Sequence, residues 1–491
     1  MDVLNGIVGV FSPVLLLYCL AGCVLGTLIG VLPGLGPAAT MAILLPITMT
    51  LDNATGSIIM LAGLYYGASY GGSTTSILTN IPGEVSSVPT CFDGFPMTKA
   101  GRGGEALWVA AVSSFIAGII GCAILAFVGP GLARFALQFG PPEYFALLFF
   151  SLTALISLSG ESLLKGLGVG VLGMLLATMG SDPVSGEARF AYGQLALARG
   201  LDLIPVTVGL FGIAEILVSS EAGIARIYEG KLGRMMPRGQ ELAKSLKAAL
   251  RGTFIGFPLG MLPGMTPPVA SFMAYDVERR ISRHPEKFGS GVIEGVAAPE
   301  AANNANAQAG FVPLMAFGIP TGPAPALILA ALMIYGLQPG PMLFINNKEF
   351  VWTVIGSMFV GNVILLILNL PLVGLWARLS TVPYKYLAPV ILGVCVVAAY
   401  SARNAVFDIW VALLAGVAGY AMRRCGWPVA PLILGFILGP MIELALSQSL
   451  NMGGPAIFFT RPFSAGLLLL AAIVVALSIA VARITKRRRT A

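Results

Sequence analysis

The chain has 491 residues, of which 57% are hydrophobic and only 10% charged, with a formal net charge of +7 and a mean hydropathy of +0.87. Soluble globular proteins carry roughly 25% charged residues, so this composition excludes an ordinary soluble protein. The sequence instead predicts an all-α polytopic membrane protein, because apolar stretches long enough to cross the roughly 30 Å hydrocarbon core recur along it.

The first predicted element is a helical hairpin over residues 8–50. The preceding "MDVLNG" lacks the basic residues of a cleaved signal peptide, so we expect the first apolar segment to be retained. "GTLIGVLPGLGP" (26–37) lies inside this region, and neither flank contains Lys or Arg. We interpret it as a re-entrant hairpin that enters from outside and turns at Pro33–Pro37. Close helix packing through small residues is the alternative for such glycines.

A membrane crossing over residues 57–82 follows, with Gly and Pro interruptions in "YYGASYGGSTTSILTNIPG". It leads to an inner loop that holds Lys99 and Arg102. The spans expected after it lie near residues 106–128, 143–158, 166–180 and 201–219. They place the linker 221–251 in the cytoplasm, where basic residues concentrate. Residues 1–220 would form a first membrane repeat.

The second half, residues 252–483, begins with "GTFIGFPLGMLPGMTP". Basic residues flank this segment on both sides, so a hairpin over 252–278 would enter from the cytoplasm and turn at Pro263–Pro267. An interrupted crossing at 292–337 follows. Later spans are expected near residues 351–375, 386–400, 405–422, 427–446 and 463–483, and they lead to a basic cytoplasmic tail, 484–491.

The two halves therefore read as inverted-topology repeats, each with a re-entrant hairpin and a discontinuous helix, surrounded by scaffold helices. Pro263 follows Pro33 by 230 residues, and Pro320 follows Pro82 by 238. Matched Gly/Pro-broken segments in two halves are a sequence signal for a transporter binding site. A broken helix exposes N–H groups that suit an anion and carbonyl groups that suit a cation.

The predicted site residues are mostly neutral hydroxyls, amides and glycines. Candidates for substrate binding are Gly34, Gly36, Ser73, Thr74, Thr75, Asn80, Gly264, Thr266, Asn303, Asn304, Asn306 and Thr321. Candidates for ion coupling are Gly71, Gly72, Asn304, Gln308 and Glu300, and the predicted break residues are Pro33, Pro37, Pro82, Pro263, Pro267 and Pro320. A polar, Gly-rich helix interface without a ligand is the alternative for each stretch.

Acidic residues inside a membrane are costly and often functional. Glu84, Glu294 and Glu300 are candidates for proton or cation coupling, whereas we expect interfacial or structural roles for Glu215 and Glu443.

Enzymatic readings find no support. HExxH and Walker A motifs are absent. Asp52, Asp93 and Asp182 read as loop residues, which argues against an intramembrane aspartyl protease. The six scattered Cys residues suggest packing and His284 a solvated loop, so neither a cofactor nor a metal ligand set is predicted. The basic clusters fit cytoplasmic loops and give no reason to expect a nucleic acid partner.

Several phrases together resemble the large membrane subunit of tripartite tricarboxylate transporters over essentially the whole chain. They include both hairpin phrases, "FDGFPMTKAGRGGEAL" (92–107), "EGVAAPEAANNANAQAGFVPLMAFGIPTGPAPALIL" (294–329) and "RNAVFDIWVALLAGVAGYAMRRCGWPVAPLILGFILGP" (403–440). The signature positions matched are Gly34, Gly36, Pro37, Gly71, Gly72, Pro82, Pro263, Gly264, Pro320 and Gly322. The second hairpin has Thr266 where the first has Gly36.

The resemblance implies a small membrane subunit and a periplasmic substrate-binding protein as partners. It also implies import of a carboxylate such as citrate, coupled to Na⁺ or H⁺, across a bacterial inner membrane. The N-terminus would be periplasmic and the C-terminus cytoplasmic. The hairpins and broken crossings would move against the scaffold, in an elevator-like way, to alternate access. A stand-alone carboxylate carrier is the alternative, and an ion channel with re-entrant hairpins is a weaker one.

Overall fold

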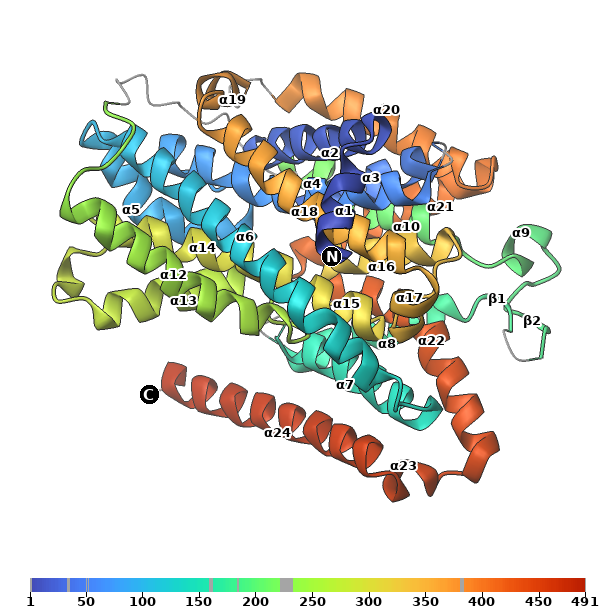
Figure 1. Cartoon of the computed structure of the whole chain (residues 1–491). Helices are drawn as coiled ribbons and strands as arrows, with labels where there is room; N and C mark the ends of the chain where they lie inside the picture. Colours follow the sequence, from blue (N-terminus) through green and yellow to red (C-terminus); the bar gives the residue numbers. More distant parts are fainter. Residues whose placement is uncertain are drawn as a thin grey trace.

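The computed structural model describes residues 2–32, 36–49, 51, 53–158, 162–182, 185–220, 233–379 and 384–490. These residues form a bundle of helices, and the strands found among them are two short ones, β1 (Gly180–Ser181) and β2 (Ala188–Arg189), which pair antiparallel (Figure 1). Six described helices are long and apolar enough to cross a membrane. The predicted all-α, polytopic class is therefore confirmed.

Helices of the first half are α1 (Asp2–Val10), α2 (Pro13–Val31), α3 (Pro37–Met49), α4 (Ala54–Thr79), η1 (Val85–Ser87), α5 (Val88–Lys99), α6 (Gly103–Ala136), α7 (Pro141–Leu158), α8 (Leu163–Ala177), α9 (Leu195–Ala198), α10 (Leu203–Thr207), the π-helix η2 (Val208–Ile213) and α11 (Ala214–Ser219). The predicted crossing over 57–82 is a continuous helix through Thr79, and its interruption comes at Asn80–Glu84. Ser69 to Ser76 are thus helical.

Helices of the second half are α12 (Gln240–Gly260), α13 (Pro267–Ile281), η3 (Pro285–Lys287), α14 (Glu294–Ala309), α15 (Phe311–Phe317), α16 (Pro323–Ile334), α17 (Pro341–Asn346), α18 (Lys348–Asn369), α19 (Val373–Leu379), α20 (Tyr384–Ser401), α21 (Val406–Arg424), α22 (Ala430–Gly453), α23 (Ile457–Thr460) and α24 (Pro462–Thr490). The predicted crossing at 292–337 is interrupted between α15 and α16. The basic tail continues α24 as a helix up to Thr490.

Close glycine-mediated packing joins α2 to α4, and the same packing joins α12 to α14. In each pair, three glycines spaced four residues apart face backbone carbonyls of the partner helix. A Cβ on any of them would lie only 2.2–2.6 Å from a carbonyl oxygen. The contacts are Gly22–Met60, Gly26–Leu64 and Gly30–Ala68 in the first half, and Gly252–Ala298, Gly256–Ala302 and Gly260–Asn306 in the second. Only glycine permits such an approach of two membrane helices.

These contacts recur with fixed residue offsets. Each glycine of α12 follows its counterpart in α2 by 230 positions, and each partner residue in α14 follows its counterpart in α4 by 238. Helix ends recur with the same offsets. α3 and α13 both begin at proline, Pro37 and Pro267, while α4 and α15 both end at a left-handed residue, Asn80 and Gly318. Proline suits the first turn of a helix, and a left-handed residue ends one.

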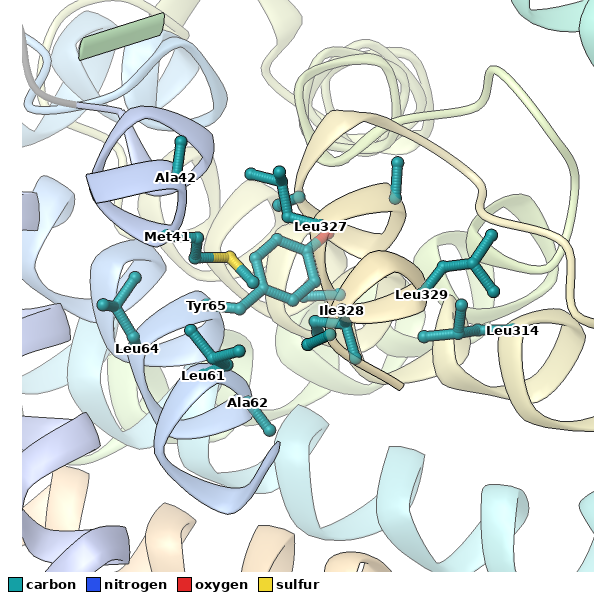
Figure 2. Packing of buried hydrophobic residues seen from close by; sticks show 14 of the residues in the cluster. Met41, Ala42, Leu61, Ala62, Leu64, Tyr65, Leu314, Leu327, Ile328 and Leu329 are labelled. Carbon is teal, nitrogen blue, oxygen red and sulfur yellow. The ribbon is translucent and has the colours of Figure 1, made fainter. Parts of the chain in front are cut away.

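The apolar core joins the two halves. Figure 2 shows the Tyr65 ring of α4 between Met41 of α3 and Leu327 and Ile328 of α16. All of these side chains are buried. The core thereby packs the beginning of α16 against α4. The second interruption directly precedes α16, and the first directly follows α4.

The packing between α12 and α14 gives a test of stability. Gly256→Ala places a Cβ 2.2 Å from the Ala302 carbonyl oxygen, whereas nothing lies within 4 Å of a Cβ on Gly168, in α8. Because overpacking of a close contact costs about 1–3 kcal/mol, we expect Gly256→Ala to lower the thermal unfolding temperature of the purified protein. Gly168→Ala is the matched control and should leave it unchanged; equal effects of the two would contradict this account.

Candidate functional site

A cavity of ≈700 Å³ lies where four interrupted segments of the chain meet. Two of these are the predicted hairpin tips, whose described residues contribute Gly36–Ala39 and Thr266–Pro268. The other two are the interruptions after α4 and α15, which contribute Pro82–Ser86 and Thr321–Pro325. Its volume is in the range of small-molecule sites, roughly 300–1,000 Å³. The cavity therefore brings together segments that lie far apart in the sequence.

Local sequence explains why the helices start at this cavity. α3, α13 and α16 begin at Pro37, Pro267 and Pro323, and each of these prolines lines the cavity. A helix start carries partial positive charge. Proline has no N–H, however, so the hydroxyls of Thr266 and Thr321 add donors where the backbone offers fewer.

Hydrogen bonds hold the second hairpin tip in place. The Gly264 N–H donates to the Thr321 carbonyl (3.1 Å), and the Asn306 amide donates to the Met265 carbonyl (2.8 Å). Gly264 has φ of +85°, a conformation that favours glycine. The tip is thus hydrogen-bonded both to the second interruption and to α14.

Among the described residues, three charged ones line the cavity: Glu84, Glu215 and Arg423. Glu84 follows the first interruption, and its carboxylate accepts a hydrogen bond from Ser86. Glu215, on α11, forms an ion pair with Arg423, at the end of α21, and also accepts a hydrogen bond from Ser219 (3.1 Å). The cavity wall therefore presents one arginine, already paired, among mostly neutral groups.

The cavity includes some of the predicted site residues and excludes others. Gly36, Thr266 and Thr321 line it, as do the break residues Pro37, Pro82 and Pro267. Pro33 and Gly34 lie outside the described residues. Pro263 and Pro320 flank the tip and the interruption without lining the cavity, and Asn80 is an exposed helix-ending residue.

A second group of predicted residues lies in a buried polar cluster between α4, α14 and α6. Ser73 donates to the Glu300 carboxylate (2.5 Å), and Asn304 donates to Ser114 (2.8 Å) and to Asn303 (2.5 Å). All of these side chains are buried, and none of them lines the cavity. The predicted site residues are therefore divided between the cavity and this separate polar cluster.

Helix packing accounts for the positions of the remaining predicted residues. Gly71 faces the Thr27 carbonyl, where a Cβ would lie at 2.3 Å, and Gly72 faces the Glu84 side chain. Thr75 donates to the Gly72 carbonyl (3.2 Å), and Gln308 accepts from the Cys122 thiol (3.6 Å).

Sequence reasoning missed Arg423 as a cavity residue and expected an interfacial or structural role for Glu215. The two are 208 positions apart, and no local pattern links them. The interpretation of Asp93 as a loop residue was wrong, because it lies within α5 and is fully buried. Its carboxylate accepts bonds from the Tyr275 hydroxyl (2.9 Å) and from the N–H groups of Gly289, Gly291 and Val292 (3.0, 2.9 and 2.8 Å).

The profile of the "Tripartite tricarboxylate transporter TctA family" matches residues 16–434. The chain belongs to this family. Two relatives from Agrobacterium vitis accord with the match. The first, an "uncharacterized 52.8 kDa protein in TAR-I ttuC' 3'region", is 45% identical over 476 residues, which are 95% of this chain and 94% of the relative. The other, an "uncharacterized protein in TAR-II ttuC' 3'region", is 43% identical over 226 residues, or 46% of this chain and 93% of the relative.

No solved structure matches the chain. Membership in the TctA family nevertheless makes the chain a subunit of a tripartite tricarboxylate transporter, and it is a multi-pass membrane protein. The family is one of transporters, so the expectation of a protein that is not an enzyme stands at this general level. The resemblance noted from the sequence is confirmed.

The Asp93 hydrogen bonds give a test of loop anchoring in this TctA-family chain. Because Asp93 alone accepts three N–H groups of the loop 289–292, Asp93→Asn should loosen that loop. We expect tryptic cleavage after the neighbouring Lys287 to accelerate severalfold in the purified protein. Asp276→Asn, which alters an exposed carboxylate paired with Arg280, is the matched control and should cleave at the wild-type rate. An unchanged rate in Asp93→Asn would refute the anchoring role.

Proposed function

We propose that this chain is the large membrane subunit of an importer for carboxylates, such as a di- or tricarboxylate, and that the cavity is its substrate site. The observation that carries the proposal is the meeting of two hairpin tips and two helix interruptions at one cavity. Irregular backbone at membrane depth is tolerated where it lines a cavity, and such paired breaks mark the binding sites of secondary transporters.

The chemistry of the cavity suits a carboxylate. Helix starts at Pro37, Pro267 and Pro323 direct partial positive charge to it, and Thr266 and Thr321 offer hydroxyl donors. Arg423 offers a guanidinium that could exchange its partner Glu215 for a substrate carboxylate. The carboxylates of Glu84 and Glu215 repel an anionic substrate. A cation imported together with the substrate would reduce this repulsion.

Polar contacts between distant segments support the sidedness proposed from the charge pattern. One set joins residues assigned to the cytoplasmic side: Arg102–Glu241, Arg234–Glu105, Arg251–Glu278, Arg423–Glu215 and Lys165 with the Cys425 carbonyl. A second set joins residues assigned to the periplasmic side: Lys348–Asp2, Arg189–Glu443, Arg461–Glu143 and Arg403 with the Gly200 carbonyl. In each of these contacts, both residues are assigned to the same side of the membrane. We therefore infer a periplasmic N-terminus in a bacterial inner membrane.

Under this orientation the cavity lies toward the cytoplasm. Its lining includes the Glu215–Arg423 pair from the cytoplasmic set and no member of the periplasmic set. We infer that the described conformation is inward-facing. The recurrence of the helix packing at offsets of 230 and 238 residues supports two equivalent repeats, which could exchange roles between inward- and outward-facing states.

Uptake into proteoliposomes tests the function. The chain, reconstituted with a small membrane subunit from the same transport system, should accumulate radiolabelled carboxylate only when the cognate periplasmic binding protein and an inward Na⁺ or H⁺ gradient are both present. Uptake without the binding protein would identify a stand-alone carrier. Carboxylate flux that never exceeds equilibrium would identify a channel, and either result would overturn the proposal.

A cavity-filling variant tests the assigned site. Gly36 lines the cavity, and a Cβ built there meets no atom of the described residues within 4 Å, so Gly36→Phe should fold while occupying the space for substrate. We expect uptake to fall at least about tenfold, with an unchanged unfolding temperature. Gly131→Phe, at an equally open position of α6 outside the cavity, is the control and should retain uptake. Normal uptake by Gly36→Phe would place the substrate elsewhere.

A further inference from the structure

A small polar void lies between α4, α6 and α18, separate from the large cavity. Its volume is ≈10 Å³, about the space that one water-sized particle needs. Polar side chains from all three helices line it: Tyr70, Ser73 and Thr74 from α4, Ser114 from α6 and Asn369 from α18. A polar void of this size calls for a single small occupant.

Two amide oxygens beside the void have no hydrogen-bond partner among the described residues, namely Oδ1 of Asn369 and Oδ1 of Asn304. Both side chains are deeply buried, with 4% and 0% of their surface exposed. Asn369 lines the void, and the Asn304 amide nitrogen donates to Ser114 on its wall (2.8 Å). Unpaired buried oxygens are rare because leaving one unsatisfied costs about 1–3 kcal/mol.

A buried carboxylate stands directly behind the void. Glu300 is fully buried and accepts hydrogen bonds from Ser73 (2.5 Å), Thr90 and Asn303 (3.5 Å). It forms no ion pair with any described residue. A buried charge of this kind is expensive without an opposite charge nearby. Ser73 joins the two features, since its hydroxyl both bonds Glu300 and lines the void.

We propose that this void binds one Na⁺ ion. Its ligands would be the hydroxyl oxygens of Ser73 and Ser114 and the amide oxygens of Asn369 and Asn304, with Glu300 supplying the balancing charge through Ser73. Hard cations take oxygen ligands of this type. A water molecule could satisfy the amides but would leave the carboxylate uncompensated. K⁺ is larger than Na⁺ and needs longer bonds to its oxygen ligands, so a void of this size favours Na⁺.

The position of the site would connect the ion to substrate movement. Ser73 lies on α4 and Asn304 on α14, and these are the helices that lead to the two interruptions at the cavity. An ion held between them would stabilise one arrangement of the two repeats. This transport role rests on the proposed function, whereas the binding of Na⁺ does not.

Thermal unfolding of the purified full-length chain tests the binding. We expect NaCl at about 0.1 M to raise the unfolding temperature saturably, relative to equal ionic strength of KCl or choline chloride. Ser114→Ala removes one ligand and should weaken the apparent Na⁺ affinity at least about tenfold. The neighbouring Ser113→Ala also shortens a buried serine of α6, but Ser113 does not line the void, so this control should respond as wild type.

Other outcomes would overturn the site. Equal unfolding temperatures in all three salts would indicate a bound water molecule, and a shift that follows pH but not Na⁺ would indicate a proton on Glu300. A wild-type response in Ser114→Ala would place any Na⁺ elsewhere. If Ser114→Ala does not fold, binding of radioactive sodium is compared between the wild type and Asn369→Ala. Weaker binding by Asn369→Ala would support the site, and equal binding would place the Na⁺ elsewhere. Carboxylate uptake driven by H⁺ alone, with no Na⁺ binding, would sink this inference and leave the proposed function intact.

Discussion

The structure depends on one constraint: backbone groups inside a lipid bilayer must find their partners within the protein, so a helix can be interrupted only where protein covers the break. The glycine contacts of α2 with α4 and of α12 with α14 provide that cover, because they bring backbone against backbone. Gly83 illustrates how tight the cover is. A Cβ there would lie 1.9 Å from the Gly30 carbonyl oxygen, so the first interruption rests directly on the contact between α2 and α4.

Repetition of this arrangement produces the cavity. Each half supplies one predicted hairpin tip and one interruption, and the apolar core around Tyr65 and Leu327 holds the halves together at their meeting point (Figure 2). The resulting wall consists largely of prolines, glycines and neutral hydroxyls. Under the proposed function, recognition at this wall would depend mainly on helix ends and hydroxyl groups, with few charged side chains.

Directional polar contacts add to the apolar core between the halves. Tyr70 donates to Asn362 (3.2 Å), Ser73 to Glu300 and Tyr275 to Asp93. Each of these bonds joins a residue of the first half to one of the second. Hydrogen bonds of this kind have preferred geometries and low net free energy, about 0.5–1.5 kcal/mol each. They therefore give the contact between the two halves a preferred geometry.

The sequence by itself determined the membrane class and the family, and its Gly- and Pro-rich phrases indicated the regions in which interruptions should lie. These follow from composition and from backbone preferences that are local: proline starts a helix, and glycine permits close approach. Even the 230- and 238-residue offsets, visible between Pro33 and Pro263 and between Pro82 and Pro320, recur in the helix contacts. Only the tertiary structure decided that α4 is unbroken to Thr79, that Asp93 anchors a distant loop, and that Arg423 meets Glu215 at the cavity. The contacts of Asp93 and Arg423 join residues more than a hundred positions apart. Local backbone preferences do not determine which distant residue becomes the partner.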